Sequence, residues 1–370
     1  MHVERELDID VVEAATRRIE SIFANATAIY LSFSGGKDSL CIADLTLSLA
    51  LQGRIDASRL TVHFIDEEAI FPCVEQVVRQ WRSRFMLAGA RFDWFCLEVR
   101  HYSCLNLVEN DENFFCWDRT KRDVWIREPP PFAIRSHPLF KPRKDSYQDF
   151  LPRLNNGQNI VGLRASESVQ RTRNLYLSLN SDVPMSKRNT VFPIYDWRDV
   201  DVWHYLSDRH VQVPDAYMHM YQIGVAKRQL RISQFFSVDT IATLAHLGEY
   251  YPELIGKVLA REPNAYLVSL YFDSEMFRRR TRTRRELEGG TARSYKDAVL
   301  SLLGNIPANF LTHHQRFVAE QYSVVVMGMG HAMEERDYRD MYEGLIAGDP
   351  KRRTLRAIRS KLKRNAVAAA

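Results

Sequence analysis

The feature that most constrains the fold is a regular alternation of strand-like and helix-like segments through the first two thirds of the 370-residue chain. Five runs are apolar and rich in β-branched or aromatic residues; they cover residues 27–34, 60–66, 91–99, 159–164 and 190–197. Strands that alternate with helices at this spacing are typical of an open parallel sheet covered by helices. We therefore predict an α/β protein with a five-stranded, Rossmann-like, doubly wound sheet.

The segment after the first strand is ambiguous from its pattern alone. Residues 45–52, LTLSLALQ, alternate as a strand would. The apolar stretch from Leu40 is long and rich in Leu and Ala, however, and Asp44, Ser48 and Gln52 form a polar stripe at a spacing of four. These features favour a helix.

Two other helices can be placed in this part of the chain. Residues 71–89 read as one helix. Another is expected to begin near Asp196 or Trp197, with Asp199 in a first turn where the helix dipole favours an acid.

The remainder of the chain is organised differently. Residues 100–158 are proline-rich and basic in part, which indicates a loop insertion or lid. From about residue 215 the pattern is mostly helical, and the next strand-like run is SVVVMG at 323–328. We predict a nucleotide-binding domain over residues 1–214 and an α-rich C-terminal region with a basic tail over 215–370.

A phosphate-binding motif lies at the junction of the first strand and its helix. Six residues form it: Ser34, Gly35, Gly36, Lys37, Asp38 and Ser39. It is not a Walker A loop, because Leu31 and Asp38 stand where that motif needs Gly and Ser or Thr. Glycines let backbone N–H groups converge on a phosphate, the following helix offers its positive end, and Lys37 adds a charge.

Three further segments support a family resemblance. They are VHFIDEEAIFP (62–72), NIVGLRASESVQRTR (159–173) and FPIYDWRDVDVWHYL (192–206). Together with the SGGKDS loop, they resemble the PP-loop adenine-nucleotide α-hydrolase-like superfamily, and within it the phosphoadenosine phosphosulfate (PAPS) reductase branch. YQIGVAKRQLR (221–231) is similar to the IbrA-like subgroup of PAPS-reductase-like regulators. The resemblance implies binding of ATP or PAPS, cleavage of ATP between the α and β phosphates, and a ParB-like partner protein.

Several side chains outside the loop are candidate ligands of the nucleotide. Asp66 and Glu68 follow the second strand, where an acid could take a ribose hydroxyl or, at Asp66, a Mg²⁺ ion held with the phosphates. Arg164, Arg171 and Arg173 could bind phosphate or sulfate, with Glu167 orienting one of them. Second-tier anion contacts are Lys187, Arg188, Arg228 and Arg231. For Asp66 and Glu68, the alternative is an acid that the helix dipole favours at the start of a helix. For the arginines and Glu167, the alternative is a surface ion-pair network.

The cysteines restrict the chemistry. PAPS reductases proper attack sulfur with a cysteine near the C-terminus, and no cysteine follows Cys116. We therefore do not expect reduction by that route. Cys96, Cys104 and Cys116 lack a C-x-x-C pair, and even with Cys73 or His101 added their irregular spacing argues against an iron–sulfur cluster.

The remaining composition bears on location and partners. We expect a cytoplasmic protein without membrane spans. The chain has five cysteines, an odd number, its N-terminus is acidic and polar, and no apolar run reaches about 20 residues. Residues 351–364 carry eight basic residues and no acid, and 278–285 carry six arginines. These clusters could bind nucleic acid or be solvated surfaces.

Three functions remain open from the sequence. The first is an ATP pyrophosphatase or adenylyltransferase-type transferase that releases pyrophosphate, with Lys37 and Arg164 as catalytic residues. The second is a sulfur-transfer enzyme or sensor that binds PAPS or another 3′-phosphorylated adenine nucleotide. The third is a nucleotide-switched regulator or a component of nucleic-acid modification.

Overall fold

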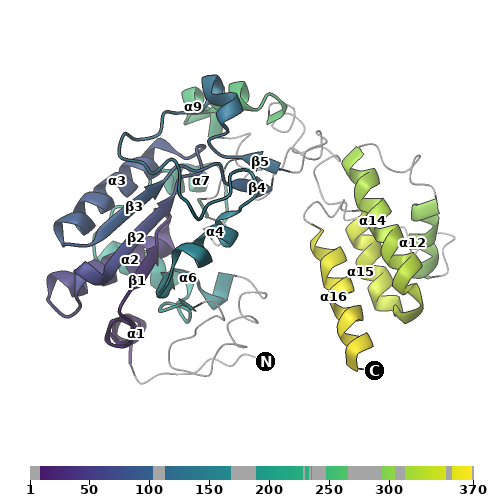
Figure 1. The fold of residues 1–370 in the computed structure, drawn as a ribbon, viewed down its shortest axis with the longest axis horizontal. Coiled ribbons are helices and arrows are strands. Elements are labelled where there is room, and N and C mark those ends of the chain that lie inside the picture. Colours follow the sequence, from purple (N-terminus) through teal and green to yellow (C-terminus); the bar gives the residue numbers. More distant parts are fainter. Residues whose placement is uncertain are drawn as a thin grey trace. The chain divides into compact units, whose positions relative to one another are not determined.

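The computed structural model describes residues 9–102, 113–167, 189–227, 230–232, 235, 247–265, 294–304, 313–346 and 352–368. The chain divides into two compact units. One contains the sheet and most elements as far as Arg261, and the other contains the helices that follow (Figure 1).

The first unit is built on a five-stranded parallel sheet. Its strands are β1 (Ile29–Ser32), β2 (Leu60–Ile65), β3 (Arg91–Phe95), β6 (Gln158–Val161) and β7 (Thr190–Val191). They are arranged in the order β3-β2-β1-β6-β7, and all neighbouring strands run parallel. The predicted five-stranded α/β sheet is therefore confirmed, although β7 is shorter than the apolar run that predicted it.

Helices connect and flank these strands. They are α1 (Val11–Asn25), α2 (Lys37–Leu51), α3 (Pro72–Leu87), α4 (Tyr147–Leu154), α6 (Asp199–Asp208), α7 (Ala216–Gln222) and α9 (Pro252–Arg261). Short 3₁₀ turns cover Ala57–Arg59, Arg119–Val124, Ala165–Glu167 and Leu247–Glu249. The helix predicted to begin near Asp196 or Trp197 begins at Asp199, which lies in the first turn of α6 as expected.

The ambiguous segment 45–52 belongs to α2, as the polar stripe indicated. Asp44 on that stripe is buried and accepts hydrogen bonds from Tyr205 Oη at 2.8 Å and Arg209 Nε at 3.2 Å. Arg209 also donates to Ser48 Oγ at 3.0 Å. The stripe is therefore the contact between α2 and the C-terminal end of α6.

Part of the proline-rich segment 100–158, around Ile134 and Phe150, is packed against the sheet. Two short strands, β4 (Arg100–Tyr102) and β5 (Asn113–Phe115), flank residues 103–112. Ile134 donates its N–H to Trp94 O at 2.8 Å and accepts from Cys96 N–H at 3.0 Å, so it continues the sheet beside β3. The ring of Phe150 packs against those of Phe95 and Phe140 in one buried cluster. The role of residues 100–158 as a lid stays a prediction.

The second unit contains a cluster of helices: α12 (Tyr295–Gly304), α14 (His313–Met329), α15 (Glu335–Ile346) and α16 (Arg353–Ala368), with a 3₁₀ turn at Gly330–Ala332. Their buried side chains form one apolar core that includes Val299, Tyr322, Met341 and Ile358.

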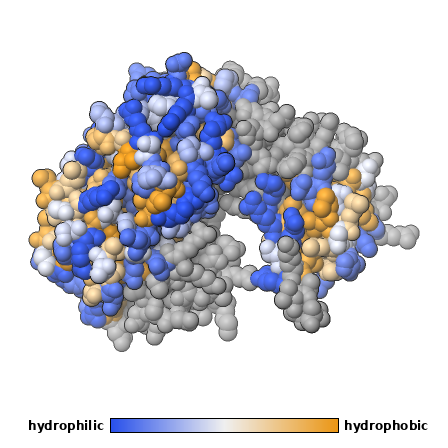
Figure 2. Space-filling model, in the orientation of Figure 1, coloured by the Kyte–Doolittle hydropathy of each residue, from blue (hydrophilic) through white to orange (hydrophobic). Residues whose placement is uncertain are grey.

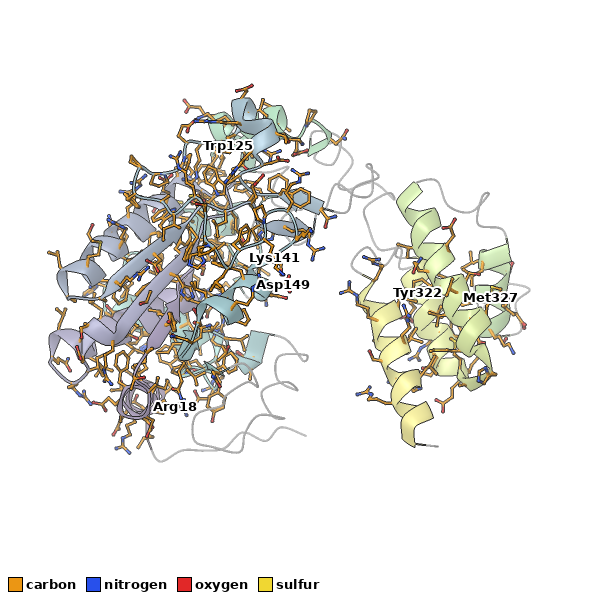
Figure 3. All side chains as sticks on the ribbon, in the orientation of Figure 1. Arg18, Trp125, Lys141, Asp149, Tyr322 and Met327 are labelled. Carbon is orange, nitrogen blue, oxygen red and sulfur yellow. The ribbon has the colours of Figure 1, made fainter. Side chains whose placement is uncertain are left out.

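The prediction of a strand-like run at 323–328 is wrong, because these residues belong to α14. Tyr322 and Val325 are buried, whereas Val324 is 62% and Met327 84% exposed. Figure 3 labels both Tyr322 and Met327 on the helices of the second unit. Burial therefore follows the helical period, which outweighs the β propensity of consecutive valines.

The described helices do not include a membrane span. None of them is both long and apolar enough to cross a bilayer. Hydrophilic residues cover much of the face of each unit shown in Figure 2, and apolar residues appear between them in small groups.

Candidate functional site

The loops after β1 and β6 meet at the carboxyl edge of the sheet. From β1 the chain adds β2 and β3 on one side, and it returns to add β6 and β7 on the other. Open α/β sheets bind their ligands at such a switch point. A Cβ at Gly162 would lie 2.8 Å from Asp38 O and 3.1 Å from Ser39 N, so only glycine lets the two loops approach this closely.

The first glycine of the SGGKDS loop is also required by the fold. Gly35 has φ +71°, and a Cβ there would lie 2.8 Å from Val78 Cγ2 of α3. Gly36 is the N-cap residue of α2, and a Cβ there would meet the Tyr217 hydroxyl at 3.2 Å. The loop is thus held against α3 on one side and α7 on the other.

The two serine hydroxyls of the loop bond to the loop itself. Ser39 Oγ donates to Gly36 O at 2.9 Å and lies 3.1 Å from Ser34 Oγ. It also accepts the N–H of Ser34 at 3.3 Å. These bonds close the turn, and donation to a phosphate stays a prediction for both serines.

Two buried cations, Lys37 and Arg164, are brought together from different loops; each is 3% exposed. Arg164 Nε lies 2.5 Å from Asp38 Oδ1, and Lys37 Nζ lies 3.4 Å from Asp38 Oδ2. Both cations also reach Asp199 Oδ1, Lys37 at 3.6 Å and Arg164 at 3.3 Å. Two positive and two negative side chains therefore form one cluster at the switch point.

Neutral groups complete the surroundings of the two cations. Lys37 Nζ donates to Leu230 O at 3.2 Å, and Arg164 Nη1 donates to Ser166 Oγ at 3.1 Å. The N–H of Lys37, in the first turn of α2, donates to Tyr217 Oη at 2.8 Å. Burial raises the pKa of Tyr217, so the phenol stays protonated at neutral pH. Tyr217 thus holds a backbone donor of the kind that binds anions.

Other predicted anion contacts fall mostly outside the described residues. Arg171, Arg173, Lys187, Arg188 and Arg228 lie outside them, as does the side chain of Glu167, which ends the turn Ala165–Glu167. Arg231 follows Leu230, the residue whose carbonyl accepts from Lys37. Ligand contacts by all of these residues stay predictions.

Asp66 is fully buried at the end of β2, and protein groups surround its carboxylate. Trp94 Nε1 donates to Oδ2 at 2.7 Å, and the N–H of Glu68 donates to Oδ1 at 3.1 Å. Arg127 forms an ion pair with the same carboxylate.

Glu68 is also fully buried, with φ +65°. Its carboxylate pairs with Arg261 Nε at 2.9 Å and accepts the N–H of Trp117 at 2.7 Å. Burial raises the pKa of Glu68, and Arg261 opposes that shift. Glu68 therefore joins the end of β2 to the segment near Trp117 and to the end of α9.

These surroundings do not fit a magnesium ion bound directly by Asp66. The guanidinium of Arg127 is in contact with that carboxylate, and a second cation would be repelled there. Among the residues that the structure describes, no three His, Cys, Asp or Glu side chains are grouped to hold a metal. We assign no step to a metal.

The structure describes two of the three cysteines at 96, 104 and 116. Cys96 and Cys116 are buried, and burial raises the pKa of both thiols. Cys104 lies outside the described residues. Raised pKa values keep Cys96 and Cys116 as thiols rather than reactive thiolates at neutral pH.

Sequence reasoning missed four residues around the predicted ligands. The sequence predicts Asp199 only as a helix-start acid and gives no signal for Tyr217, Arg127 or Arg261. Each acts through a partner at least 59 positions away in the chain. No local spacing in the sequence signals such pairs.

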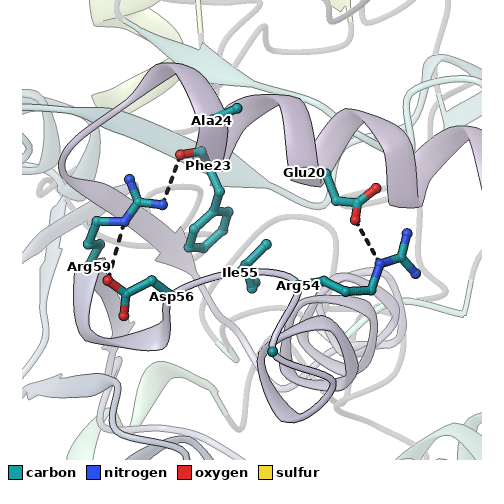
Figure 4. Close-up of a pocket in the computed structure, with 8 residues that line it drawn as sticks. Glu20, Phe23, Ala24, Arg54, Ile55, Asp56 and Arg59 are labelled. Atoms are coloured by element: carbon teal, nitrogen blue, oxygen red, sulfur yellow. Dashed lines mark hydrogen bonds and ion pairs between the residues drawn. The ribbon is translucent and has the colours of Figure 1, made fainter.

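A shallow pocket lies at the opposite edge of the sheet (Figure 4). Its lining includes Glu20 and Phe23 of α1 and residues 53–56 and Arg59, which precede β2. Glu20 pairs with Arg54 at 2.7 Å, and Arg59 donates to Phe23 O at 2.9 Å. The pocket is therefore separate from the loops that carry Lys37 and Arg164.

Comparison with known proteins gives a family and several individual likenesses. Residues 28–226 match the family described as "Phosphoadenosine phosphosulfate reductase domain". Over 254 residues the chain is 28% identical to "Uncharacterized protein YbdN" of Escherichia coli strain K12. That match covers 63% of this chain and 60% of the relative, so the chain spans about three fifths of the relative's length.

Two solved structures are similar at low identity. The FMN adenylyltransferase of Candida glabrata has a TM-score of 0.31 and 15% identity, over 59% of this chain and 63% of that one. The U34-tRNA thiolase NcsA of Methanococcus maripaludis, solved with its [4Fe-4S] cluster, has a TM-score of 0.32 and 12% identity, over 70% and 80%.

Proposed function

The chain belongs to the phosphoadenosine phosphosulfate reductase domain family, and from this premise we propose that it binds an adenine nucleotide where the loops after β1 and β6 meet. One observation carries the proposal. Lys37 and Arg164, buried and from different loops, lie 3.6 Å and 3.3 Å from a single oxygen of Asp199. A phosphate oxygen in place of that carboxylate oxygen would meet both cations at once.

To bind there, the nucleotide must displace groups that now pair with Lys37 and Arg164. Asp199 is the more accessible of the two carboxylates, with its side chain 33% exposed against 19% for Asp38. Asp38 is also held by the short contact to Arg164. We expect Asp199 to leave first and Tyr217 to release the N–H of Lys37, while Asp38 stays and orients Arg164.

The proposed reaction is attack on the α-phosphorus of ATP by an acceptor. A bond forms between the acceptor and the α-phosphorus, the bond from that phosphorus to the bridging oxygen breaks, and its electrons leave with pyrophosphate. The acceptor loses its proton to solvent or base. Lys37 and Arg164 would stabilise the charge that grows on the leaving pyrophosphate, and such electrostatic stabilisation usually supplies most of the rate enhancement.

A second candidate keeps the site and changes the nucleotide to PAPS. The family description favours it, and Arg164 together with Arg171 and Arg173 could supply the extra contacts that a 3′-phosphate and a sulfate need. In this candidate the chain takes part in sulfur transfer or senses the nucleotide. The ParB-like partner protein and the nucleotide-switched regulator implied by the IbrA-like resemblance stay predictions, which co-purification from cells would test.

Calorimetric titration tests the proposal. Wild-type chain and Lys37→Ala are titrated with ATP, a non-hydrolysable ATP analogue, PAPS and 3′,5′-ADP, and pyrophosphate release is measured with ATP. Lys257→Ala is the matched control, because Lys257 is exposed on α9. We expect Lys37→Ala to lose nucleotide binding and turnover, and Lys257→Ala to keep both.

The outcomes separate the candidates. Tight binding of ATP with pyrophosphate release supports the transferase, and preference for PAPS and 3′,5′-ADP supports the sulfur-nucleotide site. If Lys37→Ala binds every nucleotide as the wild type does, the site is elsewhere and the proposal is wrong.

A further inference from the structure

Helix α16 presents two different faces. Leu355, Ile358 and Leu362 are buried in the core of the second unit. Arg356, Arg359 and Arg364 are exposed. At 100° per residue these three arginines fall within an arc of about 140°, opposite the buried face.

The three exposed arginines differ from Lys361 in their acidic neighbours. Lys361 of the same helix pairs with Asp337 at 2.8 Å and with Glu334 at 3.2 Å. By contrast, among the described residues no acid pairs with Arg356, Arg359 or Arg364. The sequence from residue 351 onward also contains no Asp or Glu. Within the part of the chain that the structure describes, this face therefore carries positive charge without an acidic partner.

The packing of α16 decides between kinds of partner. A basic amphipathic helix can bind a membrane by inserting its apolar face. Here that face already packs against α14 and α15, so insertion would require the helical core to open. The available surface is the charged one, and it fits a partner that presents its anions on the outside.

We propose that α16 is a docking surface for double-stranded nucleic acid, which it binds through backbone phosphates. Arg356 and Arg364 are separated by about 12 Å along the helix, at 1.5 Å per residue, so they can contact different phosphates. Arginine binds phosphate with two parallel N–H donors, which suits a positional contact without base reading. DNA and RNA duplexes share this chemistry.

Fluorescence anisotropy of the full chain with 20-base-pair DNA and RNA duplexes tests the inference. The test variant combines Arg356→Gln, Arg359→Gln and Arg364→Gln; Gln keeps helix propensity. The matched control combines Arg17→Gln, Arg119→Gln and Arg198→Gln, three arginines exposed on the sheet-containing unit. Circular dichroism checks that each variant is folded.

The expected result is binding by wild type and control, and at least tenfold weaker binding by the test variant at 50 mM salt. Because each phosphate contact contributes about 0.9 to the slope of log K against log salt, the slope should fall by up to about 2.7. Binding to either duplex supports the proposal.

Three outcomes would overturn it: no duplex binding at 50 mM salt, equal binding by wild type and test variant, or equal competition by polyglutamate or anionic vesicles. ATP titration of the test variant should match wild type, so failure here is distinguishable from failure of the nucleotide site.

Discussion

Arg164 and Asp38 form an ion pair with 2.5 Å between Nε and Oδ1, which fastens the loop after β6 to the first turn of α2. The pair makes the two halves of the switch point one rigid unit. Lys37 and Arg164 are consequently held in position before any ligand arrives.

Asp199 is the more accessible of the two carboxylates that pair with Lys37 and Arg164 at rest, and in the proposed site it would compete with a phosphate. Replacing Asp199 with Asn should remove the competing charge and tighten nucleotide binding about tenfold, or about 1.4 kcal/mol. Calorimetry would measure the change in Kd. Asp208→Asn, at the far end of the same helix and exposed, is the control and should leave Kd unchanged. Weaker binding by Asp199→Asn would show that the carboxylate contacts the nucleotide instead.

Tyr217 contributes a buried hydrogen bond to the start of α2. Tyr217→Phe should lower the free energy of unfolding by about 1 kcal/mol and leave the N–H of Lys37 free for a phosphate. Denaturant unfolding measures the free energy of unfolding, and nucleotide titration measures the affinity for the nucleotide. Tyr221→Phe, exposed on the same helix, should change neither. A variant that lost nucleotide affinity would place the hydroxyl among the ligand contacts.

Gly35 and Gly53 form a natural pair of test positions. Both have positive φ, +71° and +69°, but only Gly35 has a neighbour that a Cβ would strike. Gly53→Ala should therefore cost about 1 kcal/mol from backbone strain alone, and Gly35→Ala about 1–3 kcal/mol more because Val78 must move. Thermal unfolding measures both. Equal losses of stability in the two variants would show that Val78 on α3 moves aside without a measurable cost.

His63 should make the protein sensitive to acid. It is fully buried on β2, where burial lowers its pKa to about 4, and its Nε2 lies 3.1 Å from Ser32 Oγ. Above pH 6.5 the ring is neutral in both the folded and the unfolded chain. As the pH falls from 6.5 toward 4 the unfolded chain gains the proton first, so the free energy of unfolding should fall by about 3 kcal/mol.

The His63→Gln variant tests this dependence. Its unfolding free energy should lose that slope between pH 6.5 and 4, whereas His204→Gln, at an exposed position, should keep it. Chemical denaturation across this pH range supplies the measurement. A slope that survives in His63→Gln would have to come from other groups.

The buried pair of Glu68 and Arg261 should behave unlike an exposed pair. Arg261→Met leaves a buried carboxylate without its cation and should cost about 3–5 kcal/mol, part of which Glu68→Gln should restore in the double variant. Arg54→Met breaks the exposed pair with Glu20 and should cost under about 1 kcal/mol. If the double variant were no more stable than Arg261→Met, the loss would come from packing.

The sheet and its phosphate loop could be predicted because their signals are local. The strand at 29–32 and the glycines after it follow one another in the chain. The contacts that Lys37 makes with Asp199, Tyr217 and Leu230 could not be predicted from the sequence, because these residues lie 162 to 193 positions away in the chain. The error at 323–328 has another cause: valine favours strands, and only the core around Tyr322 shows which residues of that helix are buried.

The order of the strands has a consequence for biosynthesis. β1 pairs with β2 on one side and with β6 on the other, and residues 33–157 separate β1 from β6. While the ribosome makes those residues, one edge of β1 has no partner strand, and such edges are prone to wrong pairing. Lys37 also emerges long before Asp199. The nascent chain must therefore pass through a stage in which one edge of β1 is open and Asp38 is the acidic partner of Lys37 without Asp199; the arrival of β6 and then of Asp199 ends this stage.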